Sequence, residues 1–151
     1  MIVTFCGHSQ FIKTQNREDQ LLFVLKNIVG DTPAEFFFGG YGAFDDFAYN
    51  CCKKYQLTHP KTKLIYVTPY LLRKSDLQCK TTQYDSIIYP EIENVPPKYA
   101  IYHRNRWMVM QADFIIAFIT HSTGGAYQTY HYAISKNKAI VNLADFSEFE
   151  I

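Results

Sequence analysis

The stretch "DFIIAFITHSTGGAY" at residues 113–127 decides the fold. Residues 113–120 are the most strand-like run in the chain, because β-branched and aromatic side chains dominate them. Small residues and two glycines follow, and a stretch free of helix breakers comes after them. A strand that passes through glycines into a helix is typical of a parallel sheet, so the stretch predicts an α/β fold.

The rest of the chain repeats this alternation of strand and helix. We predict further strands at 2–6, 35–40, 63–70, 84–90 and 138–143. Helical spacing of apolar residues begins near Asn16 and again near Phe44, a short helix is expected within 71–83, and residues 98–111 contain no breaker. The sequence therefore predicts one domain over 1–151, with a mainly parallel sheet of about six strands and helices on both faces.

Composition sets the outer limits of this prediction. The chain has 151 residues, of which 48% are hydrophobic, and this is enough for one full-sized core. Its four cysteines show no zinc-site spacing and no extracellular framework, so they are expected to be reduced and to bind no metal. No apolar run approaches the roughly 18 residues that cross a bilayer, and no signal-peptide pattern starts the chain, so we expect a cytoplasmic protein without a membrane partner.

Net charge bears on the partner. The formal charge is +1, with 19% charged residues, which predicts no broad basic field. Nucleic acid is therefore not expected as a partner, and an anionic ligand would have to be held locally.

Three loops at predicted strand exits are unusual in composition. They are "GHS" at 7–9, "GGYGAFDD" at 39–46 and "THSTGGAY" at 120–127. In open parallel sheets ligands bind outside the carboxyl ends of the strands, where helix N-termini attract phosphate. The alternative is that the glycines only make tight turns. The expected ligand-binding residues are Gly7, His8, Ser9, Gly39, Gly40, Tyr41, Gly42, Arg104, His121, Ser122, Thr123, Gly124 and Gly125.

The segments "GGYGAFD", "RNRWMVMQADFIIAF" and "STGGAYQTYHYAISKNKAIVNL" resemble the SLOG superfamily over nearly the whole chain. That superfamily groups the DNA-processing DprA/Smf proteins, the "lonely guy" phosphoribohydrolases and many small single-domain bacterial members, and this chain is most similar to the last group. The resemblance implies a Rossmann-like domain that binds a nucleotide or nucleotide-derived ligand, with its phosphate near the glycine loops. We expect no cofactor.

The phosphoribohydrolase motif is only partly present. The resemblance aligns Arg104 with the arginine that serves cleavage of the N-glycosidic bond in those enzymes. Their glutamate, in PGGxGTxxE, has no counterpart, because Tyr130, His131 and Tyr132 follow Thr129 here. A phenol or an imidazole is a poor substitute for a carboxylate at an oxocarbenium-like centre. Cleavage of the familiar kind is therefore not expected.

The catalytic residues stay unknown, with Arg104, Asp45 and His121 as candidates. Alternatively, Arg104 lies on a solvated helix face and has no role in a site. Asp45 could instead be an acidic residue of the first helical turn that stabilises the helix N-terminus. The function we expect is nucleotide binding, as in a sensor of a signalling nucleotide. The alternatives are an N-glycosidic-bond enzyme, either a phosphoribohydrolase or a nucleoside deoxyribosyltransferase-like protein, and a DprA-like DNA-handling protein.

Aromatic residues exceed what one small core must hide, at 17% of the chain. Tyr99, Tyr102 and Trp107 recur at roughly helical spacing on one predicted helix. We therefore expect a homodimer or higher oligomer with residues 98–111 near the interface.

Overall fold

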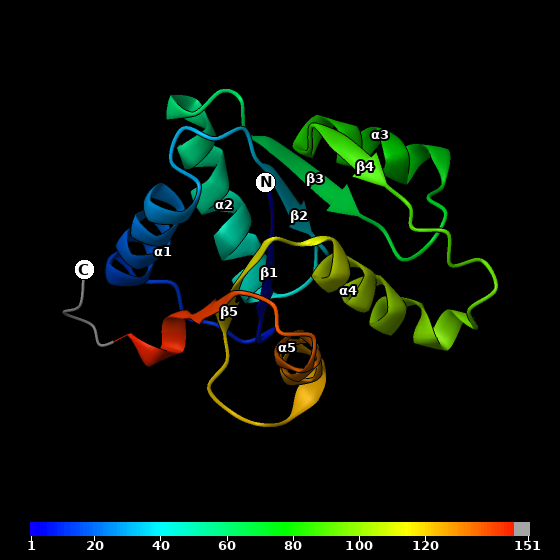
Figure 1. Ribbon diagram of the computed structural model, residues 1–151. Coiled ribbons are helices and arrows are strands. Elements are labelled where there is room, and N and C mark those ends of the chain that lie inside the picture. Colours follow the sequence, from blue (N-terminus) through cyan, green and yellow to red (C-terminus); the bar gives the residue numbers. More distant parts are fainter. Residues whose placement is uncertain (147–151) are drawn as a thin grey trace.

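The computed structural model describes residues 1–146, which form one α/β fold with a central sheet between layers of helices (Figure 1). The strands, all parallel, lie in the order β4-β3-β2-β1-β5-β6. They are β1 (Ile2–Gly7), β2 (Glu35–Phe38), β3 (Lys63–Val67), β4 (Ser86–Ile88), β5 (Phe114–Phe118) and β6 (Ile140–Asn142). The predicted six-stranded parallel sheet is confirmed.

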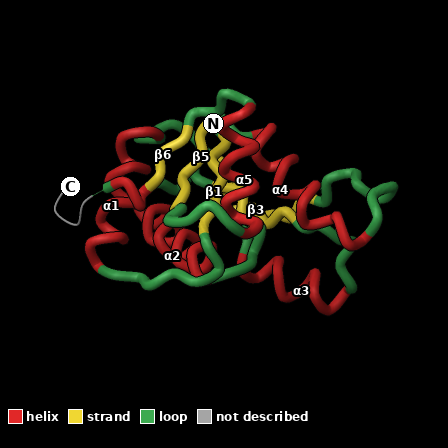
Figure 2. The backbone as a smooth tube through the Cα atoms, turned by 90° about the horizontal axis from the view of Figure 1, so that it is seen from below, coloured by secondary structure: helices red, strands yellow, loops and turns green. Residues whose placement is uncertain are grey.

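Helices cover both faces of this sheet, as predicted. On one face lie α1 (Gln15–Ile28) and α2 (Ala43–Thr58), and on the other α4 (Ala100–Gln111) and α5 (Gly124–Ser135), as Figure 2 shows. The shorter α3 (Lys74–Gln83) lies beside β4, and the 3-10 turns η1 (Pro97–Tyr99) and η2 (Leu143–Asp145) precede α4 and follow β6. None of the helices within residues 1–146 is long and apolar enough to span a membrane.

The first helix starts slightly earlier than the sequence indicated. We expected its beginning near Asn16, but the N-cap is Thr14, whose hydroxyl accepts the Arg17 N–H at 3.1 Å. A threonine hydroxyl satisfies one of the free N–H groups of the first turn, and this fixes the start of the helix.

The strand period of two divides the core between the faces. Phe36 and Phe38 pack with α1 and α2, whereas Phe37 between them points to the opposite face, where it stacks on Trp107 with ring centroids 5.8 Å apart. Trp107 thus belongs to the packing of α4 on the sheet. Cys6, Cys51 and Cys52 are buried and Cys79 is exposed, and all four are free thiols as expected.

Candidate functional site

The carboxyl ends of the strands hold one pocket of about 850 Å³. The chain adds strands outward from β1 to β4, then returns to place β5 on the other side of β1. Loops leaving β1 and β5 therefore diverge at this switch point, which opens a crevice. Of the expected ligand-binding residues, the structure brings eleven together around the pocket: Gly7, His8, Ser9, Gly39, Gly40, Tyr41, Arg104, His121, Thr123, Gly124 and Gly125.

Two of the expected residues do not line the pocket. Gly42 is the N-cap of α2 with a φ of 96°, and a Cβ there would lie 2.9 Å from the Ser9 Cα. Its role is a close backbone approach, in line with the tight-turn alternative. Ser122 is exposed on the loop before α5 and is not among the lining residues.

The first glycine loop already satisfies part of its own backbone. Gly40 has a φ of 74° and donates its N–H to Asp45 Oδ2 at 2.9 Å. A Cβ at Gly40 would lie 2.6 Å from Tyr66 Cε2, so the ring closes that side of the turn. Ala43, at the start of α2, donates its N–H to the Ser9 carbonyl at 2.9 Å. These N–H groups therefore hold the loop together and are not directed at a ligand.

Arg104 links this loop to the neighbouring strand. Its side chain is buried, at 3% exposure, so the solvated-face alternative is wrong. Nη1 donates to the Gly39 carbonyl at 3.0 Å and to the Val67 carbonyl at 2.9 Å, while Nε donates to Asn105 Oδ1 at 2.8 Å. Burial lowers the pKa of Arg104, and the nearby Tyr66, Asp45 and Tyr70 oppose that shift. The guanidinium lines the pocket while positioning the ends of β2 and β3.

Asp45 is the one acidic side chain among the described residues that line the pocket. Burial raises its pKa from 3.8 to about 6, against the lowering effect of the Gly40 N–H and of Arg104. It stands in the first turn of α2, as its alternative role required, and its carboxylate also faces the pocket. A carboxyl with a pKa near neutrality is able to exchange a proton there.

The second glycine loop is open where the first is closed. Thr123 is the N-cap residue of α5, but its side chain accepts no hydrogen bond from the first turn of that helix, and Gly124 has a φ of 90°. A Cβ at Gly124 or at Gly125 would have nothing within 4 Å. The space beside both glycines is therefore open, and it lies at the positive end of the helix dipole, where the first N–H groups have no intrahelical partner.

Two histidines stack beside this helix start. The rings of His8 and His121 lie 3.7 Å apart at 9°, so these two side chains meet between the β1 and β5 exits. His8 Nε2 accepts the Thr120 N–H at 3.0 Å, so a neutral His8 carries its proton on Nδ1. Burial, with the neighbouring His121, lowers the pKa of His8. His121 Nδ1 lies 3.0 Å from Thr123 Oγ1.

Sequence reasoning missed the contribution of the third strand exit. Thr68, Pro69 and Tyr70 follow β3 directly and line the pocket, as do Asn105 of α4 and Thr129 of α5. The signal was available, since the rule that places ligands at carboxyl ends of strands applies equally to "VTPY" at 67–70. Tyr41 lines the pocket from an exposed position on its loop, at 80% exposure.

The chemistry of the lining is polar without a metal-binding set. Within residues 1–146 no three histidine, cysteine, aspartate or glutamate side chains are grouped as metal ligands. Burial raises the pKa of the Cys6 thiol to about 12, so this pocket residue is protonated and a weak nucleophile. His131 and Tyr132, which stand near the glutamate position of the phosphoribohydrolases, line a different hollow on the outside of α5.

No family model and no curated protein matches this chain. Among solved structures it is similar to DNA processing protein A from Helicobacter pylori, with 17% identity and a TM-score of 0.61. The match covers 93% of this chain and 63% of the other, so the chain spans less than two thirds of that protein. That structure is described as showing a single-stranded DNA binding mode. The similarity supports a Rossmann-like fold for this chain.

The expectation that excluded nucleic acid as a partner was wrong. A protein of this fold binds single-stranded DNA. The physical reason for the error is that net charge averages over the whole surface. Residues 94–144 contain five lysines and arginines but one acidic residue, Asp113, although the whole chain carries only +1. A local positive surface is what binds phosphates, whatever the total charge.

Proposed function

We propose that the pocket at the carboxyl ends of the strands binds a nucleotide, with a phosphate at the N-terminus of α5. The observation that carries this proposal is the open start of α5, where Gly124 and Gly125 face empty space inside the pocket. Free N–H groups at a helix N-terminus bind phosphate, and glycines let the phosphate approach the backbone. The volume of about 850 Å³ is within the range of small-ligand and cofactor sites.

Aromatic and amide groups around the pocket suit the rest of a nucleotide. Tyr41 and Tyr70 stand at exposed positions of the lining and offer ring faces for a base. Asn105 accepts a hydrogen bond from Arg104 through Oδ1, which leaves its Nδ2 to donate to a base or sugar. Arg104 acts as a positioning residue, because its hydrogen bonds hold the Gly39 and Val67 carbonyls and Asn105.

The same chemistry serves a free nucleotide or a nucleotide unit within a single strand. The similarity to a protein that binds single-stranded DNA supports the second source. Binding without cleavage is favoured over N-glycosidic hydrolysis, because α5 contains no acidic residue and the lining contributes only the Asp45 carboxyl among the described residues.

Calorimetric titration with adenosine monophosphate, thymidine monophosphate and a 12-nucleotide oligo-dT tests this proposal. We expect wild type to bind at least one of the monophosphates, and Gly125→Val to weaken that binding at least tenfold by filling the phosphate position. Ser122→Val, on the same loop but outside the lining, is the matched control and should bind as wild type does. Competition between monophosphate and oligonucleotide identifies a shared site.

Two results would contradict the proposal. Unchanged affinity in Gly125→Val, with both variants folded, would remove the α5 N-terminus from the site. Free base accumulating above a heat-inactivated control during overnight incubation would replace binding with hydrolysis as the function.

A further inference from the structure

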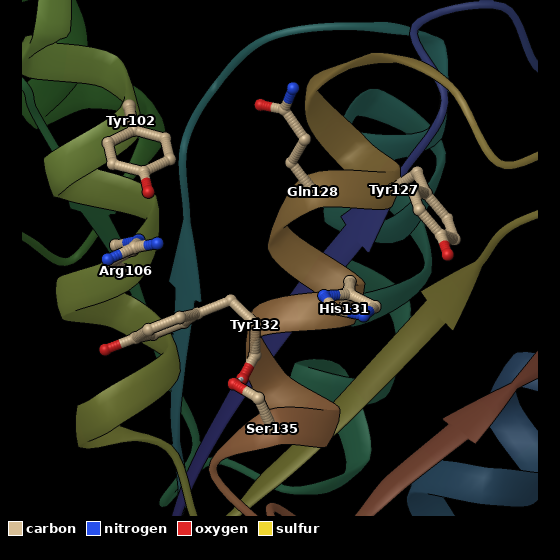
Figure 3. Close-up of a pocket in the computed structure, with 7 residues that line it drawn as sticks. All are labelled: Tyr102, Arg106, Tyr127, Gln128, His131, Tyr132 and Ser135. Carbon is tan, nitrogen blue, oxygen red and sulfur yellow. Dashed lines mark hydrogen bonds between the residues drawn. The ribbon is translucent and has the colours of Figure 1, made fainter.

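A second hollow lies on the outer side of the seam between α4 and α5. It has a volume of about 390 Å³ and does not share its lining with the pocket at the strand ends. Figure 3 shows Tyr102 and Arg106 on α4 and Gln128, His131 and Tyr132 on α5, with the Tyr132 ring reaching toward Arg106. We call this hollow the outer groove.

Arg106 is the central side chain of the outer groove. Its guanidinium carbon lies 4.3 Å from the centroid of the Tyr102 ring and 4.3 Å from that of Tyr132, so both faces are covered (Figure 3). Its Nε is buried and has no hydrogen-bond partner within the described chain. None of the ion pairs found in residues 1–146 includes Arg106. A guanidinium with stacked faces and unpaired edges is suited to an anionic acceptor that approaches edge-on.

The surroundings of Arg106 are free of competing carboxylates. The lining of the outer groove contains no aspartate or glutamate among the described residues, and neither do α4 and α5. Asp113 follows α4 but is engaged elsewhere, accepting the Ile2 N–H at 2.8 Å where β1 begins. Lys136 adds a second cation, with Nζ 5.5 Å from the Tyr132 centroid. An anion entering the groove therefore meets positive charge and no acidic residue.

Tyrosine, histidine and arginine side chains with a positive field form the kind of surface that binds single strands. Bases stack on aromatic rings, while phosphates are drawn to the cations. An acidic peptide would use the charge but would leave the tyrosine ring faces that Arg106 does not cover without flat partners. The combination of rings and charge therefore favours a nucleic-acid strand.

The outer groove and the pocket are neighbours along the same two helices. On α4, Ile101 and Asn105 line the pocket, and the next residues in sequence, Tyr102 and Arg106, line the groove. On α5, Thr129 lines the pocket and Gln128 the groove. We infer that the outer groove binds the continuation of a single-stranded nucleic acid whose terminal or flipped-out nucleotide occupies the pocket. This inference rests on the proposed function for the pocket and assigns the single strand as the source of the nucleotide.

Fluorescence anisotropy with a labelled 12-nucleotide oligo-dT, alongside calorimetry with the monophosphate that binds best, tests the inference. Gln128→Glu places an acid in the groove at an exposed position, and we expect it to weaken oligonucleotide binding about tenfold. Monophosphate affinity should stay within about twofold. Asn50→Asp on α2 is the matched control, since it makes the same charge change at an exposed position on the opposite face of the sheet and should alter neither.

Arg106→Gln adds a second measurement. This substitution should also weaken oligonucleotide binding about tenfold. It should lower the magnitude of the slope of log affinity against log salt concentration by about 1, because one phosphate contact is lost. A purely structural Arg106 would change the melting temperature without changing that slope. Should the variant fail to fold, Gln128→Glu still decides the question, because an exposed glutamine carries little of the packing.

Each outcome separates the groove from the pocket. Oligonucleotide affinity equal to wild type in Gln128→Glu would overturn the inference, and so would hexaglutamate displacing the oligonucleotide at similar concentration. Loss of oligonucleotide binding in Gln128→Glu but not in Gly125→Val would establish the groove and overturn the pocket. Monophosphate binding without oligonucleotide binding would leave the pocket and overturn the groove. Binding of neither ligand would overturn both.

Discussion

Arg104 and Arg106 stand two positions apart on α4 and meet opposite surroundings. Residues two apart on a helix do not face the same side, so the sequence predicts that the two side chains separate. Arg104 turns inward and donates to two backbone carbonyls, whereas Arg106 turns outward and stacks between two tyrosines. Their spacing alone did not reveal these partners, because the carbonyls of Gly39 and Val67 come from distant parts of the chain. Arg104 therefore lines the pocket and also holds in place the backbone at the ends of β2 and β3.

At the same scale, Asp45 predicts how stability depends on pH. Its folded pKa of about 6 is above the ordinary 3.8, so the folded protein binds this proton more tightly than the unfolded chain does. Stability contributed at this site is therefore present below about pH 4 and lost as pH rises through 6. Asp45→Asn should match wild type near pH 4 and be more stable by about 3 kcal/mol at pH 7.

Urea unfolding of both proteins from pH 4 to 8 measures this difference. Asp76→Asn makes the same change in the first turn of α3, at an exposed position outside the pocket lining, and is the control. A difference between Asp45→Asn and wild type that stays constant over the whole range would contradict the assigned pKa.

The two glycine loops look alike in sequence but differ as elements. Both follow strands and precede helices, and that much of the site was predictable, because parallel strands place their exits on one edge. The sequence did not show which of the two loops is closed and which is open. Tyr66, Asp45 and Arg104 close the first loop, and the second stays open. This difference depends on side chains that arrive from β3, α2 and α4. Glycine spacing carries no information about them.

Alanine substitutions should separate the two loops by their effect on folding. Gly40→Ala forces a side chain into a φ of 74° and toward Tyr66, so it should cost roughly 1–3 kcal/mol of unfolding free energy. Gly125→Ala meets nothing within 4 Å and should be neutral or stabilising by up to about 1 kcal/mol. Chemical denaturation of the two variants provides the comparison. An equal loss of stability in both would show that the second loop is also structural.

For the whole molecule, the alternation of strands and helices was enough to predict the sheet and its two covered faces. The distribution of charge could not be predicted in the same way, because formal net charge does not record which face carries the acidic residues. Residues 94–144 include all of α4 and α5 and hold five basic residues against one acid. The face that they build is therefore more positive than the total of +1 suggests. This asymmetry orients any anionic partner toward one side of the molecule.

The same side of the molecule carries the apolar surface from which we predict self-association. Trp107 is not part of it, since its ring stacks on Phe37. Tyr99, Ile101 and Met110 remain 49%, 50% and 46% exposed between η1 and the end of α4. Exposed apolar groups gathered on one element favour an interface between copies of the chain.

Light scattering at micromolar concentration should give a dimer or higher oligomer for wild type and a lower mass for Met110→Glu. Met110 lines neither the pocket nor the outer groove, so its substitution tests association separately from ligand binding. Leu57→Glu, at an 84% exposed position on α2, makes the same charge change on the other face and should leave the mass unaltered. A wild type that is monomeric under these conditions refutes the predicted oligomer. An equal reduction in mass by both substitutions would contradict an interface on α4. Such a result would indicate a general effect of added negative charge, because Met110 and Leu57 lie on opposite faces of the sheet.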